Sequence, residues 1–144
     1  MKNWGWVVLV VLLVGGGGLL WQYRQPVQTC LYSDAEKQTK TICVYQIKAD
    51  TKISSPLKIT GQAQGTWFFE ASFPVKILDG NDQVLTQGIA QSHGEWMTAD
   101  LIPFTAELKF IAPSTDQGTL VLQKDNPSGL PANDAALVVP IRFR

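Results

Sequence analysis

The chain has 144 residues, and its 12 basic and 12 acidic residues give it a formal net charge of zero. No block of like charge is present, so a nucleic-acid partner, which requires a basic surface, is not expected. Beyond an apolar start, roughly 120 residues remain, which is enough for one compact domain and too few for two.

Residues 4–21 form an uncharged and almost wholly apolar run. As a helix, this run would span roughly 27 Å, close to the hydrocarbon thickness of a bilayer. Trp4 and Trp21 lie at its ends, where amphipathic aromatic side chains favour the membrane interface. We predict that residues 1–24 form one transmembrane anchor. Lys2 precedes the run and favours a cytoplasmic N-terminus, which places the rest of the chain on the outer side of the membrane.

A cleaved signal peptide is the alternative interpretation of this run. Residues 7–14 would then be its apolar segment, and residues 15–18, all glycine, its cleavage site. Against cleavage, Leu19 and Leu20 continue the apolar run past the glycines, and no Ala-x-Ala-like site is visible. A helix buried in a protein core is a further alternative. We therefore favour the uncleaved anchor.

The only two cysteines, Cys30 and Cys43, follow the apolar run closely. In an exported segment such a pair is most simply a disulfide, here closing a hairpin between residues 30–33 and 41–47. Two unrelated thiols are the alternative. A metal site is not predicted, because further ligands at matching spacing are missing. We place this hairpin in a juxtamembrane segment, residues 25–52.

The remaining residues, 53–144, consist of short stretches that favour β-strands. Apolar and polar side chains alternate through residues 57–63 and again through 105–111, as on a strand with one buried face. Turn-forming residues separate such stretches, and no helical periodicity persists over three turns. About seven short strands predict an antiparallel, immunoglobulin-like β-sandwich, with a small closed barrel as the alternative. Pro140 favours an edge or bulged position for the final strand, residues 137–143.

Several motifs between Ser55 and Phe143 carry a resemblance to a known family. They are Gly65-Thr66-Trp67-Phe68-Phe69-Glu70-Ala71-Ser72-Phe73-Pro74-Val75, Glu95-Trp96-Met97-Thr98, Pro103-Phe104, Asp125-Asn126-Pro127-Ser128-Gly129 and Asn133-Asp134. In these motifs the chain resembles the immunoglobulin-like domain of bacterial spore germination proteins, the Gmad2 family. The resemblance implies an extracytoplasmic, non-catalytic β-sandwich, found alone or beside other envelope domains. It supplies no catalytic residues, and without a germination-type partner domain it implies no role in germination itself.

Two stretches are candidate binding sites. Trp67, Phe68 and Phe69 are consecutive, so on a strand Trp67 and Phe69 would share one face and Phe68 would lie on the other. One face would belong to the core, and the other would offer an aromatic surface to a glycan or a protein. The alternative is that a neighbouring loop covers it. Asp125, Asn126 and Pro127 begin an oxygen-rich loop, for which Asx-turns are an explanation as good as bound calcium. We predict no metal and no cofactor.

Catalysis has little support in the sequence. His93 is the only histidine, and Ser92 beside it would point away from it on a strand. Nothing in the sequence brings Glu70 and Glu95 together as an acid and a base. We expect a membrane-anchored, non-catalytic binding or adhesion module of the bacterial cell envelope that recognises an envelope protein or a cell-wall glycan. The alternative is a structural subunit of an envelope assembly, joined to its neighbours through β-strand edges.

Overall fold

The computed structural model describes residues 26–33 and 39–144. The predicted anchor, residues 1–24, therefore lies outside the described residues, and within them no helix is long and apolar enough to cross a membrane. The described elements are β1 (Gln28–Tyr32), β2 (Lys40–Tyr45), β3 (Thr51–Lys52), β4 (Leu57–Gln64), η1 (Gly65–Trp67), β5 (Ser72–Asp79), β6 (Val84–Ser92), β7 (Leu101–Leu108), β8 (Gln117–Gln123), η2 (Pro131–Asn133) and β9 (Ala136–Arg142).

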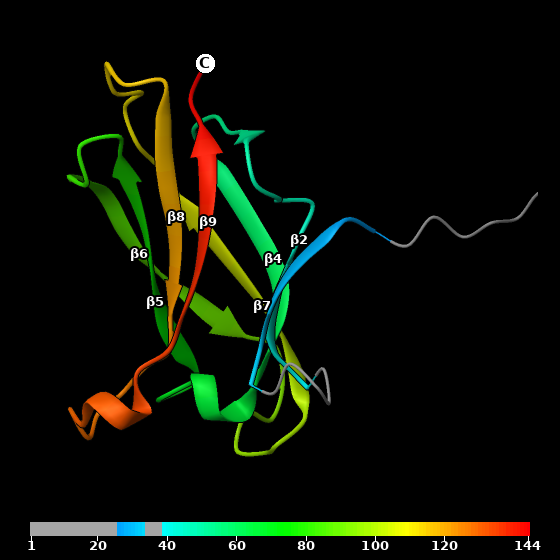
Figure 1. Ribbon diagram of the computed structural model, residues 1–144. Coiled ribbons are helices and arrows are strands. Elements are labelled where there is room, and N and C mark those ends of the chain that lie inside the picture. Colours follow the sequence, from blue (N-terminus) through cyan, green and yellow to red (C-terminus); the bar gives the residue numbers. More distant parts are fainter. Residues whose placement is uncertain (1–25, 34–38) are drawn as a thin grey trace, which may run out of the picture.

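The strands form one hydrogen-bonded order, β1-β2-β4-β7-β6-β5-β8-β9-β3, which folds over into two facing layers (Figure 1). The fold-over occurs at β6. This strand pairs with β5 over nearly its whole length but with β7 only at Gln91↔Thr105 and Ser92↔Phe104. Every strand pairing is antiparallel except that of β3 with β9. The predicted all-β, immunoglobulin-like fold is confirmed for the described residues.

Alternating side chains build the core between the two layers. In β4, β5, β8 and β9 every second residue is buried, as the period-two pattern of the sequence predicts. Fully buried Phe73 lies at the aromatic centre of this core. Its ring centroid is 5.9 Å from that of Trp67, 5.2 Å from that of Phe68 and 5.0 Å from that of Phe104. These rings tie the start of β5 to the facing strand β7.

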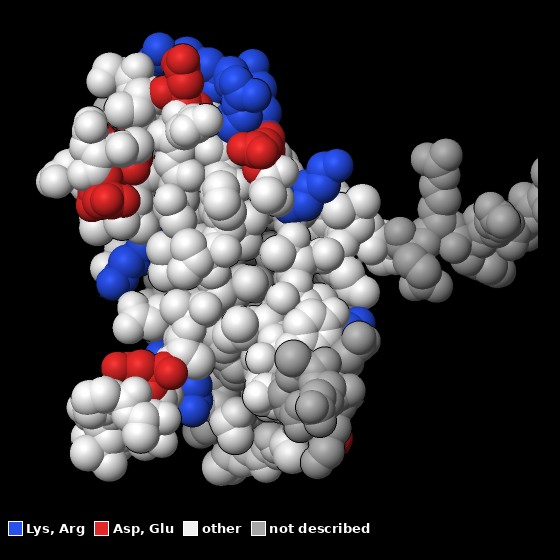
Figure 2. Space-filling model, viewed as in Figure 1, with Lys and Arg blue, Asp and Glu red and all other residues white. Residues whose placement is uncertain are grey.

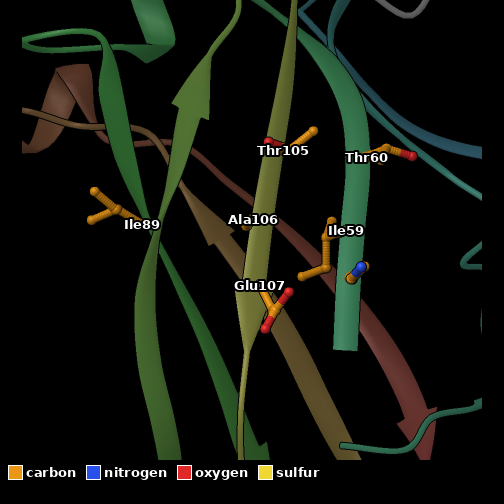
Figure 3. A pocket seen from close by; sticks show the side chains of 7 residues that line it. Ile59, Thr60, Ile89, Thr105, Ala106 and Glu107 are labelled. Atoms are coloured by element: carbon orange, nitrogen blue, oxygen red, sulfur yellow. The ribbon is translucent and has the colours of Figure 1, made fainter. Parts of the chain in front are cut away.

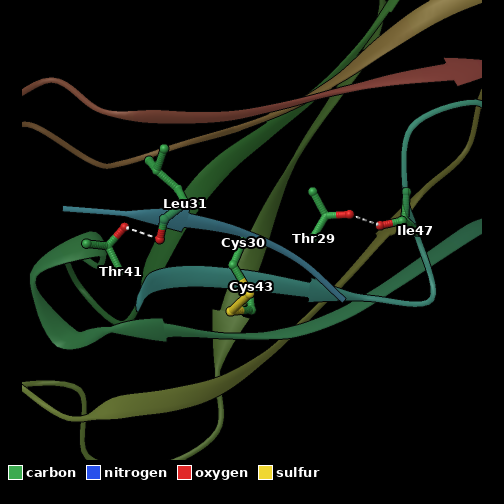
Figure 4. The surroundings of a disulfide bond; sticks show 6 residues. All are labelled: Thr29, Cys30, Leu31, Thr41, Cys43 and Ile47. Atoms are coloured by element: carbon green, nitrogen blue, oxygen red, sulfur yellow. Dashed lines mark hydrogen bonds between the residues drawn. A yellow bond between two sulfur atoms is a disulfide. The ribbon is translucent and has the colours of Figure 1, made fainter. Parts of the chain in front are cut away.

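The predicted disulfide hairpin is confirmed, and it is part of the sandwich. Cys30 and Cys43 are register partners in β1 and β2, are bonded through their sulfur atoms, and have Cα atoms 4.1 Å apart (Figure 4). β2 pairs in turn with β4, and its Ile42 and Val44 are fully buried in the common core. The Thr29 hydroxyl fastens the hairpin further by donating to the Ile47 carbonyl at 2.7 Å. Residues of the 25–52 segment thus supply strands of the domain itself.

The final strand is not at the edge of its sheet. β9 lies between β8 and the two-residue strand β3, which forms the edge. The backbone amides of Asp50 and Ile53 donate to the carbonyls of Pro140 and Arg142. This pairing uses the carbonyl of Pro140 and needs no N–H from it, which is why proline is tolerated there.

Candidate recognition surface

Three chain connections meet at one end of the sandwich, which we call the loop end. They are residues 65–71 between β4 and β5, 93–100 between β6 and β7, and 124–135 between β8 and β9. The amide of Asp125 donates to the carbonyl of Trp67 at 3.0 Å, and that of Gly65 donates to the carbonyl of Asp100 at 3.2 Å. In immunoglobulin variable domains, loops at one end of the sandwich form the ligand-binding surface.

Neither Trp67 nor Phe68 offers the aromatic surface that was predicted from the sequence, because both side chains are buried. Gly65–Trp67 forms a turn of 3-10 helix, so the two side chains do not alternate as they would on a strand. Both are buried, with exposed fractions of 2% and 4%, and both pack on Phe73. The aromatic side chain exposed here is Phe69, at 44%.

The backbone beyond Phe69 explains why the side chains of residues 67–69 do not alternate as they would on a strand. Glu70 and Ala71 have φ values of 49° and 64°, so the chain turns through the left-handed region before β5 begins. Few residues other than glycine, asparagine and aspartate adopt such angles readily, so side-chain preference does not predict them. The sequence indicated that part of the aromatic run would be exposed, but a strand pattern could not show that Phe69 alone is exposed while Trp67 and Phe68 are buried.

Asp125, Asn126 and Pro127 lie on the loop end as predicted candidates, with Pro127 exposed and the other two half-buried. The side-chain amide of Asn126 spans the loop by donating to the carbonyl of Leu130 at 2.9 Å and to Oδ1 of Asp134 at 2.7 Å. These bonds hold the polar groups of the loop against one another. Across residues 26–33 and 39–144, no group of three or more His, Cys, Asp or Glu side chains is placed to hold a metal ion.

Two adjoining hollows flank this loop. The first has a volume of about 300 Å³ and is lined by Thr66, Phe68, Phe69, Lys124, Asp125, Asn126, Pro127, Ser128 and Asn133. The second, of about 360 Å³, shares Thr66, Lys124 and Asn133 with the first and extends to Tyr32 at the end of β1. Phe69, Tyr32 and Leu130 are exposed around the hollows. Sequence reasoning missed Tyr32 and Lys124, because Tyr32 in β1 reaches the hollow beside Lys124 only through long-range strand pairing.

Another concave surface, which we call the β6–β7 hollow, lies between β6 and β7, where the two layers separate (Figure 3). It has a volume of about 380 Å³ and is lined by Lys58, Ile59, Thr60, Ile89, Thr105, Ala106 and Glu107. β7 pairs with β4 along its whole length, but among the described strands none pairs with the other edge of its last residues, Ala106–Leu108. This edge has the free backbone groups that strand addition requires.

The residues considered for catalysis serve local structure. Nε2 of His93 lies 2.8 Å from the hydroxyl oxygen of Thr105 on the neighbouring strand. Oε1 of Glu95 accepts a hydrogen bond from the amide of Met97, two residues along the same connection. The first contact fastens the β6–β7 connection to β7, and the second lies within the connection itself.

Comparison with protein families gives one match. A model described as Gmad2, the immunoglobulin-like domain of bacterial spore germination, matches residues 32–130. The matched region begins at the end of β1 and extends into the β8–β9 connection, so it includes β2 and confirms the resemblance seen in the sequence motifs. Searches of the curated proteins and of the solved structures gave no match.

Proposed function

The chain belongs to the Gmad2 family of immunoglobulin-like domains, and we propose that it is a non-catalytic binding module held at the outer face of a bacterial cytoplasmic membrane. The apolar run of residues 4–21 supports the anchor. The Cys30–Cys43 disulfide supports an extracytoplasmic domain, because such bonds persist in oxidising compartments. The ligand we propose is an envelope protein or a cell-wall glycan.

The path of the chain through β1 supports this arrangement. The carbonyl of Val27 accepts a hydrogen bond from the amide of Gln46, on the flank of the sandwich and farther from the loop end than Tyr32 (Figure 1). From there β1 runs toward Tyr32, which lines a hollow of the loop end (Figure 1). A chain anchored before residue 26 would therefore join the domain on this flank, and we propose that the loop end is directed away from the bilayer.

The observation that carries the proposal is the composition of the loop end. Exposed Phe69, Tyr32 and Leu130 surround a polar loop whose groups Asn126 holds in place. Aromatic faces pack well against sugar rings and apolar side chains, and a loop ordered before binding loses little entropy when a ligand arrives. Recognition of a protein or glycan surface needs no chemistry beyond such contacts.

Site-specific photocrosslinking of the full chain in native membranes tests the proposal. A photoreactive phenylalanine analogue replaces Phe69 in one variant and Val84, which is 56% exposed at the opposite end of the sandwich, in the control. We expect adducts from position 69 and few from position 84, with a Pro127→Ala change reducing those at 69. Equal labelling from both positions, or none from 69, would contradict the proposal. Digestion of the adducts with protease or with a glycan hydrolase separates a protein ligand from a glycan.

The free edge of β7 favours a second candidate, a structural subunit joined to its neighbours by strand addition. Ile89→Lys places a charge on the exposed wall of the β6–β7 hollow without disturbing a buried side chain. If strand addition is the function, complexes extracted from membranes lose mass in this variant, while the control Val84→Lys on the same strand keeps them intact. Unchanged complexes in both variants would exclude this edge.

A further inference from the structure

Basic side chains gather at the end of the sandwich opposite the loop end (Figure 2). Lys48 lies between β2 and β3, Lys52 lies in β3, and Arg142 lies at the end of β9; all three are exposed. We call these three residues the basic surface. Lys109 and Arg144 lie at the same end, but each has a carboxylate partner.

Lys52 and Arg142 are direct register partners in the parallel pair β3–β9. Their side chains therefore project from the same face of the sheet, side by side. The partner of Arg142 on its other side is Gln117 in β8, which carries no charge. Like charges placed next to one another on a sheet repel and destabilise it, unless an anion shared between them offsets the repulsion.

Carboxylates do not neutralise the basic surface. The ion pairs within 4.0 Å among the described residues are Lys109–Glu107 and Arg144–Asp116. Asp50 lies two residues from both Lys48 and Lys52, and with Asp79 and Asp82 it lines a hollow at the same end of the sandwich, but among the described residues it forms no ion pair with the basic surface. Three neighbouring cations are thus left facing solvent.

Among the described residues, the loop end is more negative than the end that carries the basic surface. The described basic residues of the loop end are Lys40 and Lys124, and its connections supply the larger set of carboxylates Glu70, Glu95, Asp100, Asp125 and Asp134. At the other end, the basic residues Lys48, Lys52, Lys109, Arg142 and Arg144 are balanced in number by the carboxylates Asp50, Asp79, Asp82, Glu107 and Asp116. A negatively charged surface would repel the loop end and attract the basic surface. The two ends together would orient the domain in such a field.

The described part of the chain begins on the flank that leads to the basic surface. The carbonyl of Val27 accepts a hydrogen bond from the amide of Gln46, which is two residues before Lys48. The link from Trp21, the last residue of the apolar run, to Val27 can extend over at most about 22 Å. An anchor in the bilayer would therefore hold the basic surface within reach of the lipid headgroups.

From this placement we propose that the basic surface of Lys48, Lys52 and Arg142 docks on the anionic headgroups of the bilayer that holds the anchor. The inference rests on the proposed function, because it requires the anchor. A few cations suffice, since a tether supplies a high effective concentration and each cation near an anionic membrane adds attraction. The docked domain stands with its loop end away from the membrane.

Lysine footprinting of the full chain tests this docking, with controls inside the same molecule. The chain is reconstituted in vesicles of phosphatidylcholine alone or with about 30% phosphatidylglycerol, and acetylation of each lysine is measured by mass spectrometry. We expect acetylation of Lys48 and Lys52 to slow roughly tenfold in the anionic vesicles, while Lys40 and Lys124 keep their rates. About 1 M salt, with a screening length of about 3 Å, should abolish the difference.

Two outcomes distinguish failure of this inference from failure of the proposed function. If the chain floats with both kinds of vesicle and Lys48 and Lys52 react alike in both, the docking is overturned and the anchor stands. If the chain floats with neither, both are overturned. Arg142→Glu should restore the reactivity of Lys52 in anionic vesicles, and Lys124→Glu should not; equal effects of the two variants would also overturn the docking.

Discussion

Phe68→Ala and Phe69→Ala make the same substitution at two neighbouring positions that differ strongly in burial. The side chain of Phe68 is 4% exposed, and that of Phe69 is 44% exposed. Phe68 packs against Phe73 with ring centroids 5.2 Å apart in the centre of the core. A buried aromatic side chain removes about 200 Å² from water, worth about 5 kcal/mol at 25 cal/mol per Å². With measured costs of about 3–5 kcal/mol for such truncations, we expect Phe68→Ala to lower the unfolding free energy by about 4 kcal/mol.

Phe69→Ala removes a side chain that is nearly half solvated and leaves no closed cavity. We expect it to cost about 2 kcal/mol, roughly half the loss expected for Phe68→Ala, because only about half of the Phe69 side chain is removed from water. Denaturant unfolding of both variants, followed by circular dichroism, resolves the expected difference, since extrapolated free energies carry errors of about 10–15%. Equal losses in the two variants, or a loss below about 1 kcal/mol for Phe68→Ala, would refute the assignment of Phe68 to the core.

Three further predictions concern the hairpin and the loop end. Replacing Cys30 and Cys43 together by alanine should lower the unfolding free energy by about 3 kcal/mol, because the bond closes a sequence separation of 13 residues; reductant should bring the unaltered protein to the same denaturation midpoint. Gly65→Ala should cost about 1–3 kcal/mol in thermal unfolding, because a Cβ there overlaps backbone oxygens of the β6–β7 connection, while Thr66→Ala beside it stays within about 0.5 kcal/mol. Asn126→Ala should lose about 1 kcal/mol and speed protease cleavage of the β8–β9 connection, since both hydrogen bonds of its side-chain amide disappear; an unchanged cleavage rate would show that other contacts order this loop.

Local pattern predicted the strands that have one buried face. Residues 57–63 alternate in the sequence, and β4 is found at Leu57–Gln64 with alternating burial. The disulfide was predictable too, because only two cysteines are present. The alternation depends only on residues that are neighbours in the sequence, and the disulfide depends only on the presence of two cysteines. Both could therefore be predicted without knowing which strands pair.

The candidate site was less predictable, because it depends on turns and on distant pairing. The strand expected through Trp67 and Phe68 is replaced by a 3-10 turn and two positive φ angles, which exchanges the buried and exposed aromatic residues. The hairpin's place in the core depends on β2 pairing with β4, and no local pattern specifies which strand pairs with which. Tyr32 reaches the loop end only because of that pairing.

The first strands also determine how the domain responds to mechanical load on residue 26. Tension there would peel β1 from β2, but the peeling stops after Thr29, because Cys30 is covalently bonded to Cys43. The force then passes into β2, which pairs with β4 in one layer, and onward to β3, which pairs with β9 in the other. A pull on the N-terminal segment is therefore shared between both sheets.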